Sequence, residues 1–120
     1  MPAMSRSRLP VIAFAEPLAD AARDLIADTL VEPAEKAATE RFASRPGLEA
    51  TLKFGIANEY YALTMYDRSR KLLEQVLATR SALHGEDDER TIRTVLALGN
   101  VIDTLGEQEE SERLYRRAMD

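Results

Sequence analysis

The sequence contains no cysteine and no tryptophan, and it has a single histidine among its 120 residues. Without cysteine the chain forms no disulfide and offers no thiolate to a metal or a substrate. One histidine, His84, is too few for the zinc sites and catalytic triads that depend on imidazole groups. The five glycines are scattered, so a glycine-rich phosphate loop is missing as well. These absences predict a protein without a cofactor, without a metal and without enzymatic activity.

The charge balance is acidic, because 21 Asp and Glu residues against 16 Lys and Arg residues give a net charge of −5. Nucleic acids and anionic membrane surfaces favour basic faces, so neither is a predicted partner. No apolar run approaches the roughly 18 residues that a membrane span needs. With 45% hydrophobic and 31% charged residues, the composition predicts one folded domain. Such a chain without cysteine suits the cytoplasm, which is its expected location.

Residues 1–16 are predicted to form a flexible N-terminal tail, which is polar and basic as far as Arg8. The apolar run 9–15 follows basic residues and ends in Ala-Phe-Ala, a pattern that weakly resembles a signal peptide. The run is short and contains Pro10, which favours the alternative interpretation of an apolar tail. Such a tail would pack on the first helix of the same chain or on a second copy.

Residues 17–47 are predicted to form two helices that cap the rest of the chain. Pro17 is a favoured first helical residue, and apolar side chains follow it at helical spacing as far as Leu30. Pro33 is expected to end or kink this helix and to open a shorter one that runs to about Ser44. The shorter helix is interpreted as half a repeat that stacks against the next helix.

Residues 48–120 repeat themselves at a spacing of 42 residues, which carries Asn58 to Asn100 and Ser69 to Ser111. In each copy, two apolar patterns with helical spacing flank a short turn, which predicts a helical hairpin. Self-similarity of this length is typical of arrays in which each unit buries its apolar face against its neighbours. The predicted fold class is therefore all-α, an array of helical hairpins with about six helices, two hairpins of which occupy residues 48–120.

Small residues recur at matching places, Ala57 and Gly99 in the first helices of the two units and Ser69 and Ser111 in the second helices. We expect them where the two helices of a hairpin cross, because only a small side chain permits a close approach. The predicted helix boundary signals between the units are a terminating Gly85 and a capping Asp87 or Asp88.

The order of large, small and aromatic or aliphatic residues resembles the tetratricopeptide repeat (TPR) family, for example at Leu98, Gly99, Ile102 and Ser111. A period of 42 residues exceeds the usual TPR length of about 34 and lies in the range of HEAT and armadillo repeats. TPR remains the preferred interpretation, because a long second helix and the loop 84–89 account for the excess. The resemblance implies a right-handed α-solenoid.

Residues 72–80 and 85–91 are similar to the 42-residue TPR units of kinesin light chains and of many bacterial regulators. Residues 34–47 resemble the segment that leads into TPR regions attached to bacterial serine/threonine kinases. No kinase motif is present in the sequence. This part of the resemblance therefore implies, as one alternative function, a regulatory fragment of a bacterial signalling protein.

The TPR resemblance implies a protein–protein interaction module that binds a peptide or a helix on the concave face of the array. Asn58 and Asn100 match the place where carboxylate-clamp TPR proteins hold a peptide backbone, and an amide both donates and accepts hydrogen bonds. The lysines of that clamp are absent, since Phe54 and Leu96 stand in their place. The alternative is that both asparagines form hydrogen bonds within the array. The implied peptide-binding residues are Phe54, Asn58, Tyr61, Arg93, Leu96, Asn100 and Asp103.

Self-association is the second alternative function. The last predicted helix begins near Gln108 and keeps apolar residues as far as Met119, whereas arrays usually finish with a helix that is polar on its outer face. Either the chain is a piece of a longer array, or this end meets a partner or a second copy. A homodimer through the terminal helices is therefore a further expected possibility. The apolar residues of this end are Leu114, Tyr115, Ala118 and Met119.

Overall fold

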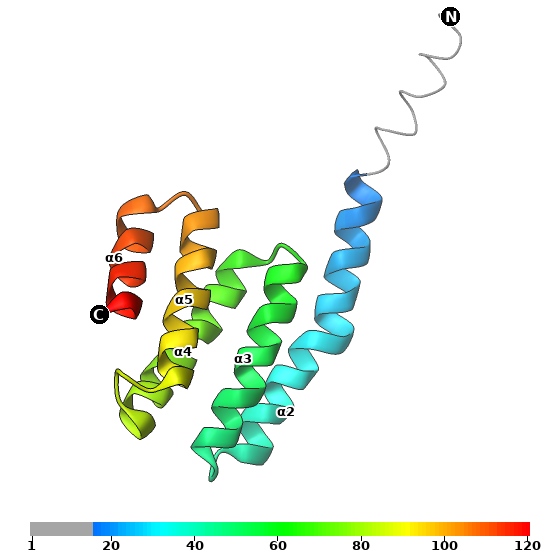
Figure 1. The fold of residues 1–120 in the computed structure, drawn as a ribbon. Helices are drawn as coiled ribbons and strands as arrows, with labels where there is room; N and C mark the ends of the chain where they lie inside the picture. The colour runs from blue at the N-terminus through cyan, green and yellow to red at the C-terminus, as the bar shows by residue number, and fades with distance from the viewer. Residues whose placement is uncertain (1–15) are drawn as a thin grey trace, which may run out of the picture.

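The computed structural model describes residues 16–120, so the predictions for the signal-like run and for the tail concern residues outside this range, except Glu16, which is helical. Residues 16–26 are helical and continue through a π-helical turn, η1 (Ala27–Val31), into α2 (Glu32–Phe42). Two hairpins follow, α3 (Pro46–Ala62) with α4 (Tyr66–His84), and α5 (Glu89–Thr104) with α6 (Gln108–Met119). Figure 1 shows them in a row, with residues 16–42 at one end and α6 at the other. The described residues contain no strand, which confirms the all-α prediction.

Residues 16–42 form one continuous helix, which is termed the N-terminal helix. The sequence predicts two helices here. Pro33 lies in the first turn of α2, directly after η1, where the Glu32 amide donates to the Ala27 carbonyl oxygen five residues earlier. A wide turn of this kind accommodates a residue that has no amide hydrogen, so the helix continues past the proline. Of the two outcomes expected at Pro33, an end or a kink, the end of the helix is therefore wrong.

The N-terminal helix packs on α3 with one side of its surface, which includes the buried Ala27, Val31 and Ala38. Next to this contact the Tyr60 hydroxyl donates to Glu35 Oε2 at 2.9 Å. The helix is thus fixed to the first hairpin by small apolar side chains, by the Tyr60 phenol and by a hydrogen bond of 3.1 Å from Arg23 Nη1 to Thr64 Oγ1.

Both hairpins close at the small residues that the sequence singles out. Ser69 Oγ donates to the Ala57 carbonyl oxygen at 2.9 Å, and Ser111 Oγ donates to the Gly99 carbonyl oxygen at 3.2 Å. All four residues are buried, and each hydroxyl finds an acceptor on the main chain of the facing helix, as a buried polar group requires. The predicted crossing points are confirmed.

The helix ends also follow the sequence signals. The backbone at Gly85 has a positive φ of 87°, and α4 ends directly before it. Of the two predicted capping residues, Asp88 is the one that accepts a hydrogen bond from the Arg90 amide, at 2.9 Å. No helix of the described part is both long and apolar enough to cross a membrane.

The apolar residues of α6 were expected to be exposed, but two of them pack in or against the core. Leu114 is 7% exposed and belongs to the core, and Ala118 packs partly against it. Met119 remains exposed, but Glu112 and Arg116 are exposed beside it and pair with each other. The outer side of α6 is therefore polar at these positions. The expectation of an exposed apolar stripe over residues 114–119 is wrong.

Candidate functional site

A hollow of about 220 Å³ lies between α3 and α5, the first helices of the two hairpins. It is termed the groove. Leu73 from α4, which passes behind α5 in Figure 1, and Val101 from α5 are its buried walls. Its exposed lining residues are Asn58, Tyr61 and Asn100, three of the seven side chains that the sequence predicts for peptide binding.

Helical spacing brings these side chains together. Asn58 and Tyr61 are three residues apart on α3, and Ala97, Asn100 and Val101 recur at three- and four-residue steps on α5. Residues at such steps share one face of a helix. Because the hairpins repeat the same plan, the lining faces of α3 and α5 lie next to each other with apolar side chains between them.

The two asparagines have different environments. Asn100 Oδ1 accepts a hydrogen bond of 2.6 Å from the Tyr115 hydroxyl of α6. Within residues 16–120, the Asn58 side chain has no hydrogen-bond partner and is exposed. The residue that corresponds to Tyr115 in the first hairpin is Leu73, which has no hydroxyl to offer. The alternative of bonding within the array therefore holds for Asn100 and not for Asn58.

Tyr61 is held across the groove. Its hydroxyl lies 3.1 Å from Thr104 Oγ1 on α5. The Thr104 hydroxyl donates to the Asn100 carbonyl oxygen at 2.8 Å, so its single hydrogen is used and Tyr61 is the donor in the pair. The Tyr61 ring also lies beside the Tyr66 ring, with a centroid distance of 5.3 Å. This wall of the groove is thus fixed before any ligand binds.

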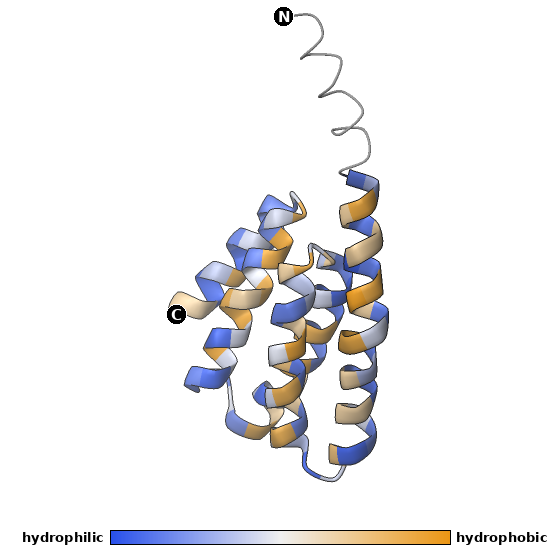
Figure 2. Cartoon of the chain, turned by 90° about the vertical axis from the view of Figure 1, so that its right-hand side faces the viewer, coloured by the Kyte–Doolittle hydropathy of each residue, from blue (hydrophilic) through white to orange (hydrophobic). Residues whose placement is uncertain are grey.

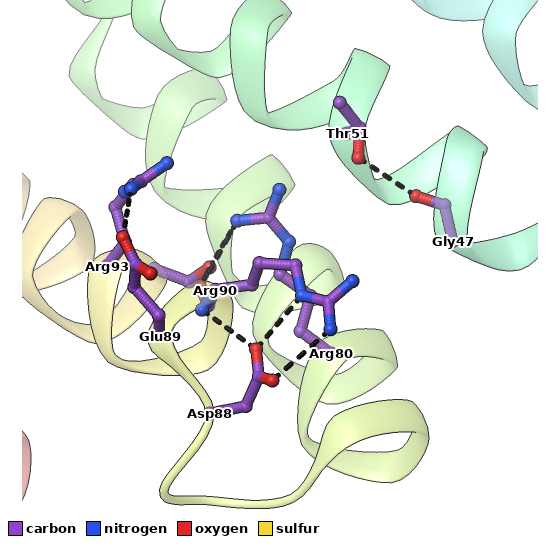
Figure 3. A network of polar contacts seen from close by, with 8 residues as sticks. Gly47, Thr51, Arg80, Asp88, Glu89, Arg90 and Arg93 are labelled. Carbon is purple, nitrogen blue, oxygen red and sulfur yellow. Dashed lines mark hydrogen bonds and ion pairs between the residues drawn. The ribbon is translucent and has the colours of Figure 1, made fainter.

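Three of the remaining predicted residues are outside the lining of the groove. Arg93 pairs with Glu89 at 2.7 Å on the surface of α5 (Figure 3). Leu96 is 41% exposed, and Asp103 is exposed. Their role in binding stays a prediction.

Phe54, the last predicted residue, lies under a buried arginine that sequence reasoning missed. Arg80 is 6% exposed, and its guanidinium carbon lies 4.7 Å from the centre of the Phe54 ring. Its Nη1 donates to Thr94 Oγ1 at 2.9 Å and to the Arg90 carbonyl oxygen at 3.2 Å. Figure 3 shows Arg80 reaching from α4 to the first turn of α5. The signal in the sequence is its place on the apolar side of α4, four residues after the buried Val76.

The charges around Arg80 affect it and its neighbours. Burial lowers the pKa of the Arg80 guanidinium, and the positive charges of Arg93 and Arg90 lower it further. The surroundings of Asp88 favour its charged form instead. The hydrogen bonds from the Arg90 side chain and amide lower the pKa of the Asp88 carboxyl group to about 2. Asp88 therefore stays ionised and fixes the start of α5, which positions the second side of the groove.

The family comparison agrees with these observations. A tetratricopeptide repeat family model matches residues 48–120, which contain both hairpins apart from the first two residues of α3 and include the whole groove. The comparisons with curated proteins and with solved structures each give no match. The family model does not distinguish the kinesin-light-chain-like subgroup, which stays a prediction. This chain belongs to the tetratricopeptide repeat proteins, whose helical hairpins generally serve protein–protein interaction.

Proposed function

We propose that this protein binds an extended peptide segment of a partner protein in the groove between α3 and α5. The observation that carries the proposal is the free, exposed amide of Asn58 beside the apolar walls Leu73 and Val101. An amide without an internal partner can donate to a peptide carbonyl and accept from a peptide amide at the same time.

The size of the groove supports a peptide as the ligand. Its volume of about 220 Å³ is smaller than the roughly 300–1,000 Å³ of pockets that hold small molecules. It suits one apolar side chain of a peptide, whose backbone then lies along the exposed rim. The fixed positions of Tyr61 and Asn100 reduce the conformational entropy that binding would otherwise cost.

The test begins with peptides selected on the immobilised full chain from a random display library. Their affinities are then measured by fluorescence anisotropy for the wild type, for Asn58→Ala and for Gln108→Ala, an exposed amide of α6 that serves as the matched control. We expect Asn58→Ala to weaken binding about 10-fold, the equivalent of one or two hydrogen bonds. The control should bind like the wild type, and all three proteins should unfold at the same urea concentration. Peptides that bind Asn58→Ala as tightly as the wild type would show that the groove is not the binding site.

A further inference from the structure

Arg80 is a buried cation without a carboxylate partner. Its side chain is 6% exposed, and it takes part in no ion pair within the part of the chain that the structure describes. Its neighbours Arg90 and Arg93 are paired, with Asp88 and with Glu89. Buried arginines usually have a partner of opposite charge, because an unpaired charge loses its hydration without compensation. The charge of Arg80 is therefore left to be balanced from outside the protein.

The protein itself uses only one of the guanidinium nitrogens of Arg80. Nη1 donates to Thr94 Oγ1 and to the Arg90 carbonyl oxygen. Nε and Nη2 have no hydrogen-bond partner among the described residues, and neither atom is fully buried. In Figure 3 one terminal nitrogen of Arg80 bears a dashed line and the other bears none. The N–H groups of Nε and Nη2 are thus available to a ligand.

Nε and Nη2 are the two nitrogens with which an arginine can hold both oxygens of one carboxylate. Arg90 does so in the same part of the protein, since its Nε donates to Asp88 Oδ1 at 3.0 Å and its Nη2 donates to Asp88 Oδ2 at 3.2 Å. Parallel N–H groups of this kind match the geometry of a carboxylate. The groups that remain free on Arg80 therefore favour a carboxylate as the ligand.

The guanidinium of Arg80 lies between the same two helices as the groove. Its contacts are Phe54 on α3 and Thr94 on α5. Phe54 is four residues before Asn58, and Thr94 is three residues before Ala97, and both Asn58 and Ala97 line the groove. One helical turn, about 5 Å, therefore separates the guanidinium from the groove. Hydrophobic and hydrophilic residues alternate along these helices in Figure 2.

The packing of α4 on α5 does not in itself require an arginine. The N-terminal helix packs on α3 as α4 packs on α5, and these two helices end at equivalent residues, Phe42 and His84. The residue 42 positions before Arg80 is Ala38, which is 4% exposed. A small apolar side chain thus fills the equivalent place without burying a charge. The arginine at this position indicates a role beyond packing.

We propose that a side-chain carboxylate of the bound peptide, from an Asp or a Glu, pairs with Nε and Nη2 of Arg80. The inference rests on the proposed function, because the peptide in the groove brings the carboxylate to the guanidinium. In an extended peptide, side chains two residues apart lie on the same side and about 7 Å from each other. The acidic residue therefore stands two positions before or after the apolar residue that enters the groove.

The charges around Arg80 support an acidic ligand at this place, although the protein as a whole has a net charge of −5. The pairs of Arg90 with Asp88 and of Arg93 with Glu89 are each neutral, so Arg80 adds one uncompensated positive charge. A carboxylate on Nε and Nη2 would offset the burial of this charge. It would do so where little water screens the pair, which strengthens the attraction. A neutral peptide gains nothing from this site.

The first test uses peptides selected on the immobilised full chain from a random display library, in which we expect Asp or Glu near an apolar residue. Replacing the acidic residue of a peptide by its amide should weaken binding to the wild type at least about 10-fold in fluorescence anisotropy. The same replacement should change the affinity of Arg80→Gln less than about 2-fold, because the partner is already lost. Arg113→Gln removes an exposed arginine of α6 and is the matched control, which should respond like the wild type. A full response in Arg80→Gln, or its loss in Arg93→Gln instead, would overturn the proposal.

The second test needs no variant of Arg80, so it holds even if Arg80→Gln fails to fold in circular dichroism and urea unfolding. In the nitrogen-15-labelled wild type, the Nε–H nuclear magnetic resonance signal of Arg80 should shift with the acidic peptide and stay unchanged with its amide counterpart. The same signal with both peptides would overturn the proposal. Peptides that depend on Asn58 but carry no acidic residue would also overturn it and leave the proposed function intact. Peptides that bind Asn58→Ala as tightly as the wild type would overturn both.

Discussion

The first hairpin, α3 with α4, and the second, α5 with α6, are built on one plan and differ at a few equivalent positions. Both cross at a serine that donates to a main-chain carbonyl oxygen. They differ in the residues that surround this crossing and in the residue that makes the turn. The equivalent pairs are Tyr60 and Ile102, Ala57 and Gly99, Thr64 and Gly106, and Leu73 and Tyr115.

The exchange of leucine for tyrosine at the last pair has two consequences in the second hairpin. A Cβ atom at position 99 would lie 2.8 Å from Tyr115 Cε1, so the tyrosine ring requires a glycine opposite. The hydroxyl of the same ring holds Asn100, whereas Asn58 keeps a free amide. One side chain thus makes the second hairpin a fixed wall of the groove and leaves the first hairpin to supply the free polar group.

The largest expected difference between the hairpins concerns Tyr60, whose counterpart Ile102 does not titrate. Burial, together with the hydrogen bond to Glu35, raises the pKa of Tyr60 to about 12. An unfolded tyrosine ionises near pH 10. The stabilisation that the protonated Tyr60 hydroxyl gives to the folded protein is therefore complete below pH 10 and is lost as the pH rises toward 12. The loss should approach about 3 kcal/mol. Urea unfolding of the wild type and of Tyr60→Phe between pH 8 and 12 measures it, and parallel curves for the two proteins would contradict the expectation.

The next effect concerns the close contact in the second hairpin. Gly99→Ala should lower the free energy of unfolding by about 1–3 kcal/mol, because the added methyl group displaces the Tyr115 ring. Adding Tyr115→Leu, which restores the pair found in the first hairpin, should recover most of this loss. Denaturant unfolding of the two single variants and the double variant gives the coupling directly. Additive effects would mean that the ring does not set the requirement for glycine.

The smallest effect concerns the turns. Thr64 has a φ of 62°, whereas the second turn has Gly106 at 86°. A β-branched residue is strained in this region, and glycine is not. Thr64→Gly should therefore stabilise the protein by about 1 kcal/mol, and Gly106→Thr should destabilise it. Thermal unfolding of both variants compares the two turns, and a loss of stability in Thr64→Gly would show that the turn is not strained.

Much of the fold can be predicted from the sequence, because the spacing of 42 residues and the small residues at the crossings report local packing. The continuous helix past Pro33 could not, since it depends on a π-turn that has no clear sequence signal. The sequence shows that α6 has an apolar side, but the pattern of one helix does not tell whether another helix covers that side. Leu114 therefore appeared free although it belongs to the core.

The groove is predictable only in part. Its residues follow from the family resemblance, and three of the seven line the hollow. The difference between Asn58 and Asn100 depends on a contact with Tyr115, which lies 15 residues away on another helix. Arg80 was missed because a charged side chain on an apolar helix face is usually taken as exposed. Its burial depends on acceptors from α5 that fold next to it.

The row of helices has a consequence for how the chain folds. Each helix packs mainly on the helices next to it in sequence, so most contacts are local and the search for native partners is short. Helices α3, α4 and α5 have neighbours on both sides, whereas α6 and the N-terminal helix have a neighbour on one side only. Order should therefore begin in the middle of the chain, where helices have two neighbours, and spread outward to adjacent helices. The N-terminal helix and α6 then join last, each on a hairpin partner that is already formed.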